Sequence, residues 1–319
     1  MNRRLPAASN VVLALALASA CAPSGRDTPP PPLATVAQPA TEQLVQLNGT
    51  ELFVKRMGTG EPIVIVHGGP VLEHGYLLPH LEPLAKDYEL IFYDQRLSGR
   101  SAGTAEPESV RVANFVDDIE ALRQELGLGP IHLMGHSWGG MLAMRYAIRY
   151  SDNLRSLILL DSMAASSELW HAEEAALGER ITAEAKVGIT AFQETAAFRR
   201  REPEAIATML RMSFRSQFTD PTNAALLELF VPDDYVSRSS QFGAMMVDLE
   251  SFDFHADLAG VTVPALVLYG ADEPGATLGG AAIAAALPND IHTLISGSGH
   301  FPFIENPAAF LEAVRSFLD

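Results

Sequence analysis

The chain has 319 residues, of which 48% are apolar and 19% are charged, and this composition is typical of a globular protein and not of a disordered one. Its formal net charge of −17 argues against nucleic-acid binding, which requires clustered Lys and Arg, and the triplet 199–201 is expected to be a solvated helix face. The single cysteine excludes an intrachain disulfide and a cysteine cluster for zinc. The sequence has neither the residue spacing of a metal site nor a phosphate-binding loop, so it predicts no metal and no other cofactor.

Residues 1–20 have the plan of a secretion signal. Arg3 and Arg4 precede an apolar stretch, 11–20, that is too short to span a bilayer as a mature helix. Small residues followed by Cys21 resemble the bacterial lipoprotein signal, although Ala18 stands where that signal usually has Leu. The sequence therefore predicts an exported protein anchored to the membrane by a lipid on Cys21, on the periplasmic or extracellular side. An ordinary signal peptide, giving a soluble periplasmic or secreted protein, is the alternative.

Residues 21–42 are rich in Pro and poor in large apolar side chains, and they predict an extended tether. From residue 43 onward, two apolar segments flank Asn48-Gly49, which is typical of a β-hairpin. Short apolar strands then alternate with amphipathic helices, and this alternation predicts an α/β fold with a mostly parallel sheet covered on both faces. The expected strands are 63–66, 90–93, 131–134, 154–160, 265–269 and 291–295, and the expected helices are 114–126, 139–150 and 307–317.

Residues 163–255 interrupt this alternation. They have helical patterns and no clear buried strand, and they separate two parts of the expected core, 43–162 and 256–319. A helical cap at this point would lie over the carboxyl ends of the strands, where open α/β sheets bind ligands.

The segment Gly135-His136-Ser137-Trp138-Gly139 matches the G-x-S-x-G pattern of a nucleophile elbow, with an expected strand before it and an expected helix after it. Such a turn lifts the serine hydroxyl above the sheet, so Ser137 is the predicted nucleophile. The backbone NH of Trp138 would contribute to an oxyanion hole. The second NH is expected from Gly69, in the glycine-rich loop that follows the strand 63–66.

A nucleophilic serine needs a general base that is oriented by an acid, in the chain order Ser, acid, His. His300 follows the last expected strand and is the predicted base. Asp272 and Glu273 follow the strand 265–269, and either carboxylate could accept the imidazole NH. We expect Asp272 to be the acid and keep Glu273 as the alternative.

Three motifs together resemble the prolyl (proline) iminopeptidase family of α/β hydrolases: His67-Gly68-Gly69-Pro70, the D-Q-R-L-S-G-R-S segment 94–101, and Gly135 to Gly140. The similarity spans about residues 45–162 and 256–319. Two positions depart from the family, which commonly has Gly where this chain has Val71 and Leu97. The family's acid generally stands at the position of Glu273, whereas its usual residue type is found at Asp272.

The resemblance implies an α/β-hydrolase fold with a helical cap and a serine peptidase that releases an N-terminal residue, often proline. Family members hold the free amine with acidic side chains around the cap, and residues 163–250 contain 14 acids and 8 bases. The predicted substrate is a small molecule or a short peptide. An esterase, lactonase or amidase on the same fold is the alternative, and a non-catalytic binding lipoprotein is disfavoured by the intact Ser137 and His300.

Overall fold

The computed structural model describes residues 40–103 and 105–319. The expected signal segment, Cys21 and most of the expected tether therefore lie outside the described residues. Within the described part of the chain, no helix is both long enough and apolar enough to cross a membrane.

The core is one eight-stranded sheet in the order β1-β2-β4-β3-β5-β6-β7-β8. β1 and β2, and β2 and β4, pair antiparallel, and all the other neighbours pair parallel. The predicted α/β fold is confirmed. The strands are β1 (Ala40–Leu47), β2 (Thr50–Met57), β3 (Glu61–Val66), β4 (Tyr88–Tyr93), β5 (Ile131–His136), β6 (Leu154–Leu160), β7 (Ala265–Gly270) and β8 (Asp290–Ile295).

The expected hairpin is present at the N-terminal edge of the sheet. Asn48 and Gly49 join β1 to β2 with φ values of 45° and 73°. Asn and Gly are the residues that tolerate positive φ at both central positions of a tight hairpin turn. β1 begins at Ala40, so the last residues of the expected tether, 40–42, belong to the sheet.

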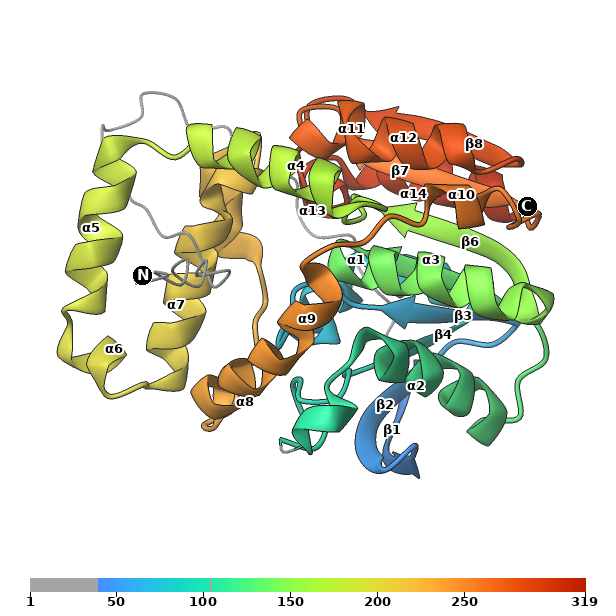
Figure 1. Ribbon diagram of the computed structural model, residues 1–319, viewed down its shortest axis with the longest axis horizontal. Coiled ribbons are helices and arrows are strands. Elements are labelled where there is room, and N and C mark those ends of the chain that lie inside the picture. The colour runs from blue at the N-terminus through green and yellow to red at the C-terminus, as the bar shows by residue number, and fades with distance from the viewer. Residues whose placement is uncertain (1–39, 104) are drawn as a thin grey trace, which may run out of the picture.

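Helices cover both faces of the sheet (Figure 1) and bury an apolar cluster on each of them. Phe115 and Leu142 belong to the cluster on one face, and Leu81 and Phe310 belong to the other. The first face carries α2 (Val112–Glu125), α3 (Trp138–Tyr150), α10 (His255–Leu258) and α12 (Gly279–Ala286), and the second carries α1 (Leu78–Leu81), α13 (Pro302–Glu305) and α14 (Pro307–Leu318).

A helical insertion connects β6 to β7, and Figure 1 shows it to the left of the sheet, beyond the carboxyl ends of the parallel strands. An isolated bridge between Ser166 and Asp253 brings the two ends of the insertion together. The basic triplet lies here, and its Arg199 and Arg200 are exposed and paired with Glu side chains. The helices of the insertion are α4 (Ser167–Glu179), α5 (Ala183–Gln193), α6 (Ala196–Arg199), α7 (Pro203–Phe214), α8 (Tyr235–Gln241) and α9 (Met246–Leu249).

Candidate active site

Ser137 occupies a sharp turn between β5 and α3. Its φ of 54° and ψ of −121° are strained for a residue with a side chain, and such strain is characteristic of functional sites. The neighbouring glycines allow the turn: a Cβ on Gly135 would lie 2.3 Å from the carbonyl oxygen of Gly139, and a Cβ on Gly139 would lie 2.2 Å from that of Val66. The sequence thus builds the elbow from two close backbone approaches and one strained serine.

The elbow opens into a cavity of about 560 Å³ between the sheet and the insertion. The core contributes Gly69, Ser137, Trp138 and His300 to its lining. Trp138 is the first residue of α3, where a backbone NH has no acceptor within the helix. The insertion contributes mainly apolar side chains, among them Trp170, Leu177, Phe214, Tyr235 and Met245.

His300 lies beside Glu273 and not beside Asp272. Its Nδ1 is 3.5 Å from Oε1 of Glu273, whose side chain is buried and lines the cavity. Asp272 is exposed, and its carboxylate accepts a hydrogen bond from the Thr219 hydroxyl at 2.8 Å. The expectation that favoured Asp272 therefore differs from the structure. The cause is the turn after β7, in which the NH of Glu273 donates to the carbonyl of Gly270 at 3.1 Å.

His136 links the loops on either side of the elbow. Its Nε2 donates to the carbonyl oxygen of His300 at 3.0 Å, and its Nδ1 accepts from the Tyr76 hydroxyl at 2.7 Å. The same hydroxyl accepts from the NH of Gly68 at 2.7 Å. Burial holds the pKa of His136 well below its ordinary value, so the ring is neutral. The expected structural role of His136 is thus observed, but its partner Tyr76 had no signal in the sequence.

The three sequence motifs meet in one hydrogen-bond network. The NH of Gln95 donates to Nε2 of His67 at 3.0 Å, and the amide of Gln95 donates to the His67 carbonyl at 2.7 Å. The Trp138 indole donates to the Gln95 side-chain oxygen at 3.0 Å. Burial lowers the pKa of His67 to about 4, so this ring is neutral and can accept the bond. The glycine-rich loop and the elbow are therefore fixed relative to each other through Gln95.

Both departures from the resembled family lie at strained positions. Val71 has a φ of 69° and Leu97 has a φ of 64°, in the left-handed region that glycine adopts without strain. Both side chains are buried, and Val71 lines the cavity. The chain therefore keeps the left-handed backbone at these positions and places apolar side chains there.

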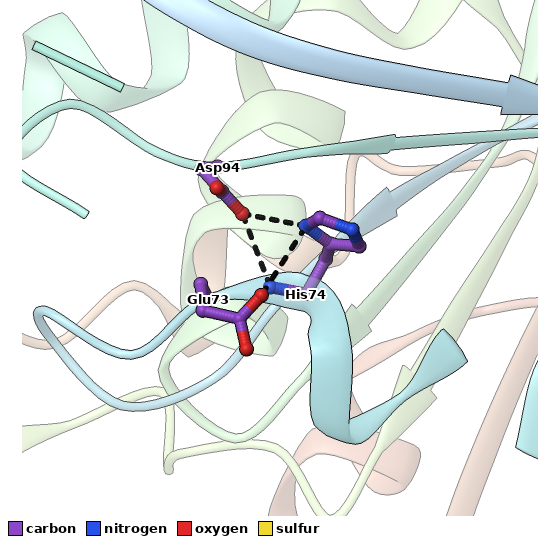
Figure 2. A group of neighbouring side chains, drawn as sticks. All are labelled: Glu73, His74 and Asp94. Carbon is purple, nitrogen blue, oxygen red and sulfur yellow. Dashed lines mark hydrogen bonds and ion pairs between the residues drawn. The ribbon is translucent and has the colours of Figure 1, made fainter. Parts of the chain in front are cut away.

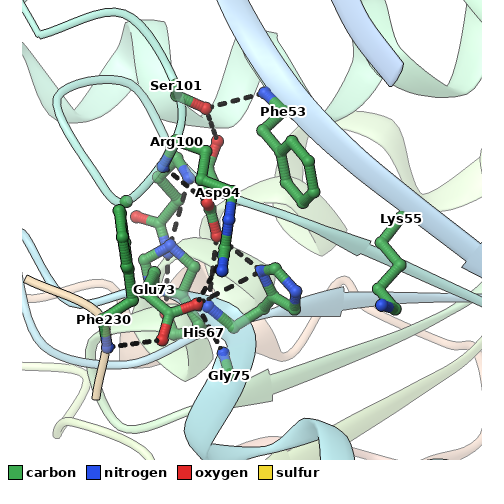
Figure 3. A network of polar contacts seen from close by, with 12 residues as sticks. Phe53, Lys55, His67, Glu73, Gly75, Asp94, Arg100, Ser101 and Phe230 are labelled. Atoms are coloured by element: carbon green, nitrogen blue, oxygen red, sulfur yellow. Dashed lines mark hydrogen bonds and ion pairs between the residues drawn. The ribbon is translucent and has the colours of Figure 1, made fainter. Parts of the chain in front are cut away.

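A second buried polar cluster is formed by Glu73, His74 and Asp94 (Figure 2). A carboxylate oxygen of Glu73, a ring nitrogen of His74 and a carboxylate oxygen of Asp94 all lie within 4.8 Å of one another. Nδ1 of His74 is 2.6 Å from Oδ1 of Asp94. The carboxylate oxygens already accept backbone NH groups, including those of Gly75, Arg100 and, from the insertion, Phe230 (Figure 3). The cluster is therefore a hydrogen-bonded tie between the core and the insertion.

Four carboxyl side chains line the cavity. Asp161, Glu173, Glu174 and Glu273 contribute to the lining, and no Lys or Arg of the described residues does. Oε1 of Glu173, on α4, accepts from the NH of Gly279 at 2.9 Å. Burial raises the pKa of Glu173 to about 8, because the charged form is poorly solvated there. The sequence indicated an acidic cap but did not single out these side chains.

Comparison with known proteins identifies the family of the fold. The family model for the α/β hydrolase fold matches residues 61–307. The chain is 27% identical to a proline iminopeptidase from Clostridium botulinum, over 82% of this chain and 91% of the relative. The crystal structure of a proline iminopeptidase from Mycobacterium smegmatis matches with a TM-score of 0.64 at 24% identity, covering 87% of this chain and 97% of the other. A thermophilic esterase from Thermogutta terrifontis matches with a TM-score of 0.58 at 26% identity, covering 87% and 98%. The chain belongs to the α/β-hydrolase fold family, and within that family it is similar to the proline iminopeptidases.

Proposed function

We propose that the protein is a serine hydrolase with Ser137 as nucleophile, His300 as general base and Glu273 as the acid that orients the base. The observation that carries this proposal is the strained Ser137 at a cavity whose lining includes His300, itself backed by the buried Glu273. At 3.5 Å, Nδ1 of His300 and Oε1 of Glu273 do not form a hydrogen bond in the structure, and Nδ1 has no other partner among the described residues. Catalytic hydrogen bonds are often long without substrate and shorten in the complex.

In the proposed reaction, Ser137 attacks the substrate carbonyl while His300 removes the proton from its hydroxyl. The backbone NH groups of Trp138 and Gly69 stabilise the oxyanion of the tetrahedral intermediate. His300 then protonates the leaving group, and water repeats the sequence on the acyl-enzyme. The network through Gln95 supports this chemistry because it holds both oxyanion loops in place.

We infer that the preferred substrate carries a free amino group next to the scissile carbonyl. Glu173 and Glu174 line the cavity and no Lys or Arg of the described residues does, so a cation is favoured there over an anion. Glu173 and Glu174 lie on α4, on the insertion side of the cavity, and are our candidates for binding the ammonium group. The similarity to proline iminopeptidases supports the same substrate class, an unblocked N-terminal residue.

The test compares prolyl and alanyl arylamides with the same compounds acetylated on nitrogen. A charge-assisted hydrogen bond contributes about 1.5–3 kcal/mol, so blocking the amine should lower kcat/KM about ten- to a hundredfold. Equal rates on free and blocked arylamides, with faster cleavage of short nitrophenyl esters, would instead support an esterase. The apolar side chains that the insertion places in the cavity favour that second candidate, and the esterase relative agrees with it.

We further propose that the protein is exported and anchored by a lipid on Cys21. The basis is the N-terminal pattern, in which an apolar stretch and small residues precede Cys21. Membrane fractionation of the wild type and of Cys21→Ser tests it: the wild type should partition with membranes and the variant should lose the lipid. Wild type found only in the soluble periplasmic fraction would favour an ordinary signal peptide.

A further inference from the structure

Asp161 is a buried acid next to the candidate site that the proposed reaction does not use. It directly follows β6, is 1% exposed and lines the cavity. Its φ of 39° lies in the left-handed region, which Asp tolerates better than most residues but which still costs free energy.

The carboxyl of Asp161 holds the turn that carries Glu273. Its NH donates to the carbonyl of Leu268 at 2.9 Å, which extends the pairing of β6 with β7. Its Oδ1 accepts from the NH of Gly270 at 2.9 Å. Gly270 is also the residue whose carbonyl accepts the NH of Glu273. One side chain therefore fixes the first residue of the turn, and the last residue of that turn is the proposed acid.

Each of the two carboxyls has one oxygen without a partner. Oδ2 of Asp161 and Oε2 of Glu273 are both buried and make no hydrogen bond within the described part of the chain. An unsatisfied buried polar atom is costly, and two neighbouring carboxylates that are both ionised are costlier still. A proton on Asp161 would remove the repulsion between the two groups and give Oδ2 a hydrogen to donate.

The surrounding groups favour a neutral Asp161. Burial, with the nearby carboxyls of Glu273 and Glu305, raises the pKa of Asp161 well above its ordinary value. Tyr269, on β7, also lies within electrostatic range and donates its hydroxyl hydrogen to the carbonyl of Ser162, not to Asp161. The titratable groups that face the pair from the insertion and the last loop are Glu173 and His300, and no Lys or Arg of the described residues lines the cavity.

We propose that Asp161 is a positioning residue for the triad: it remains a neutral carboxylic acid, its Oδ1 fixes Gly270, and its hydroxyl donates toward Oε2 of Glu273, directly or through one water. Glu273 then presents Oε1 to His300. This inference rests on the proposed function, because it assigns Glu273 as the acid.

The test measures the rate at which a fluorophosphonate labels Ser137, which requires the nucleophile and its base but no particular substrate. Asp161→Asn has the shape of the neutral acid, with an oxygen for Gly270 and an NH₂ for Glu273, and should keep the labelling rate within about threefold. Asp161→Gly accepts the positive φ but has no side chain, and should label about ten- to a hundredfold more slowly. Asp161→Ala replaces it, with the same expectation, if thermal unfolding shows that the glycine variant is not folded.

A double-mutant cycle separates positioning from a structural role. In a Glu273→Gln background, Asp161→Gly should slow labelling by less than about threefold, because its effect passes through Glu273. The inference is overturned if Asp161→Asn loses as much as Asp161→Gly, which would make the charge of Asp161 necessary. It is also overturned if the two substitutions act independently, so that the loss of labelling rate in the double variant equals the product of the losses in the two single variants. Wild-type protein that is not labelled at Ser137 would contradict the proposed function instead, so the two failures are distinguishable.

Discussion

Glu173→Gln should change the pH dependence of stability in a way that its position dictates. The pKa of this buried carboxyl is raised from about 4.5 to about 8. A raised pKa in the folded state means that the folded protein binds this proton more tightly than the unfolded chain does. The stabilisation that the protonated Glu173 contributes is therefore fully present below pH 4.5 and is lost as the pH rises through 8. For the wild type, the contribution of Glu173 to the free energy of unfolding should fall by about 3 kcal/mol between pH 5 and pH 8.

Glutamine does not titrate, so the variant should lack this fall. It keeps an acceptor for the NH of Gly279 but loses one carboxylate oxygen, which shifts its stability by a constant that does not depend on pH. Denaturant unfolding of both proteins at pH 5, 6, 7 and 8 measures the difference. The matched control is Glu179→Gln, on the exposed end of the same helix and outside the cavity lining. The difference in free energy of unfolding between the wild type and this control should be the same at all four pH values. A wild-type minus variant difference that is equal at pH 5 and pH 8 would refute the claim that Glu173 is buried as a neutral acid.

Three other predictions follow from the site. Glu273→Gln should lower kcat about 10⁴-fold, whereas Asp272→Asn should stay within a few-fold of the wild type, and steady-state kinetics with the reverse order would return the acid role to Asp272. If Glu173 binds the substrate ammonium, kcat/KM for a free-amine arylamide should rise from pH 7 toward pH 8 as Glu173 ionises, and should fall above that as the substrate amine, with a pKa of about 8, loses its proton. A pH profile shared with the acetylated substrate would exclude that role. Val71→Gly should lower the free energy of unfolding by only about 1 kcal/mol. The substitution relieves about 1–2 kcal/mol of backbone strain, and it loses about 1.5–3 kcal/mol from the burial of the valine side chain. Val64→Gly, in the extended β3, relieves no such strain and should cost several kcal/mol more in the same denaturation experiment.

Most of the fold could be predicted from the sequence, because each strand and helix is indicated by a pattern of neighbouring residues. Strands β3 and β6 contain uninterrupted aliphatic runs, 63–66 and 157–160, and the pattern around Ser137 specifies its own turn. Local patterns also located His300, since chain order and the last strand placed it on a loop.

The sequence was silent where contacts are long-range. Glu273 and Asp272 are adjacent, and only the direction of the turn after Gly270 decides which carboxyl is buried. The link from Gln95 to Trp138 spans 43 residues, and the contact of Glu173 with Gly279 spans 106. Pairings of this kind depend on how β6, β7 and the insertion pack together, which hydrophobic periodicity does not encode.

The identity of the nucleophile can be tested by mapping the site at which a fluorophosphonate labels the protein. The purified protein is treated with the probe, digested and examined by mass spectrometry, alongside Ser137→Ala and His300→Ala. The structure predicts a single label on the peptide that contains Ser137, absent from Ser137→Ala and formed far more slowly in His300→Ala. A label on another serine, or one that Ser137→Ala leaves unchanged, would contradict the assignment of the active site.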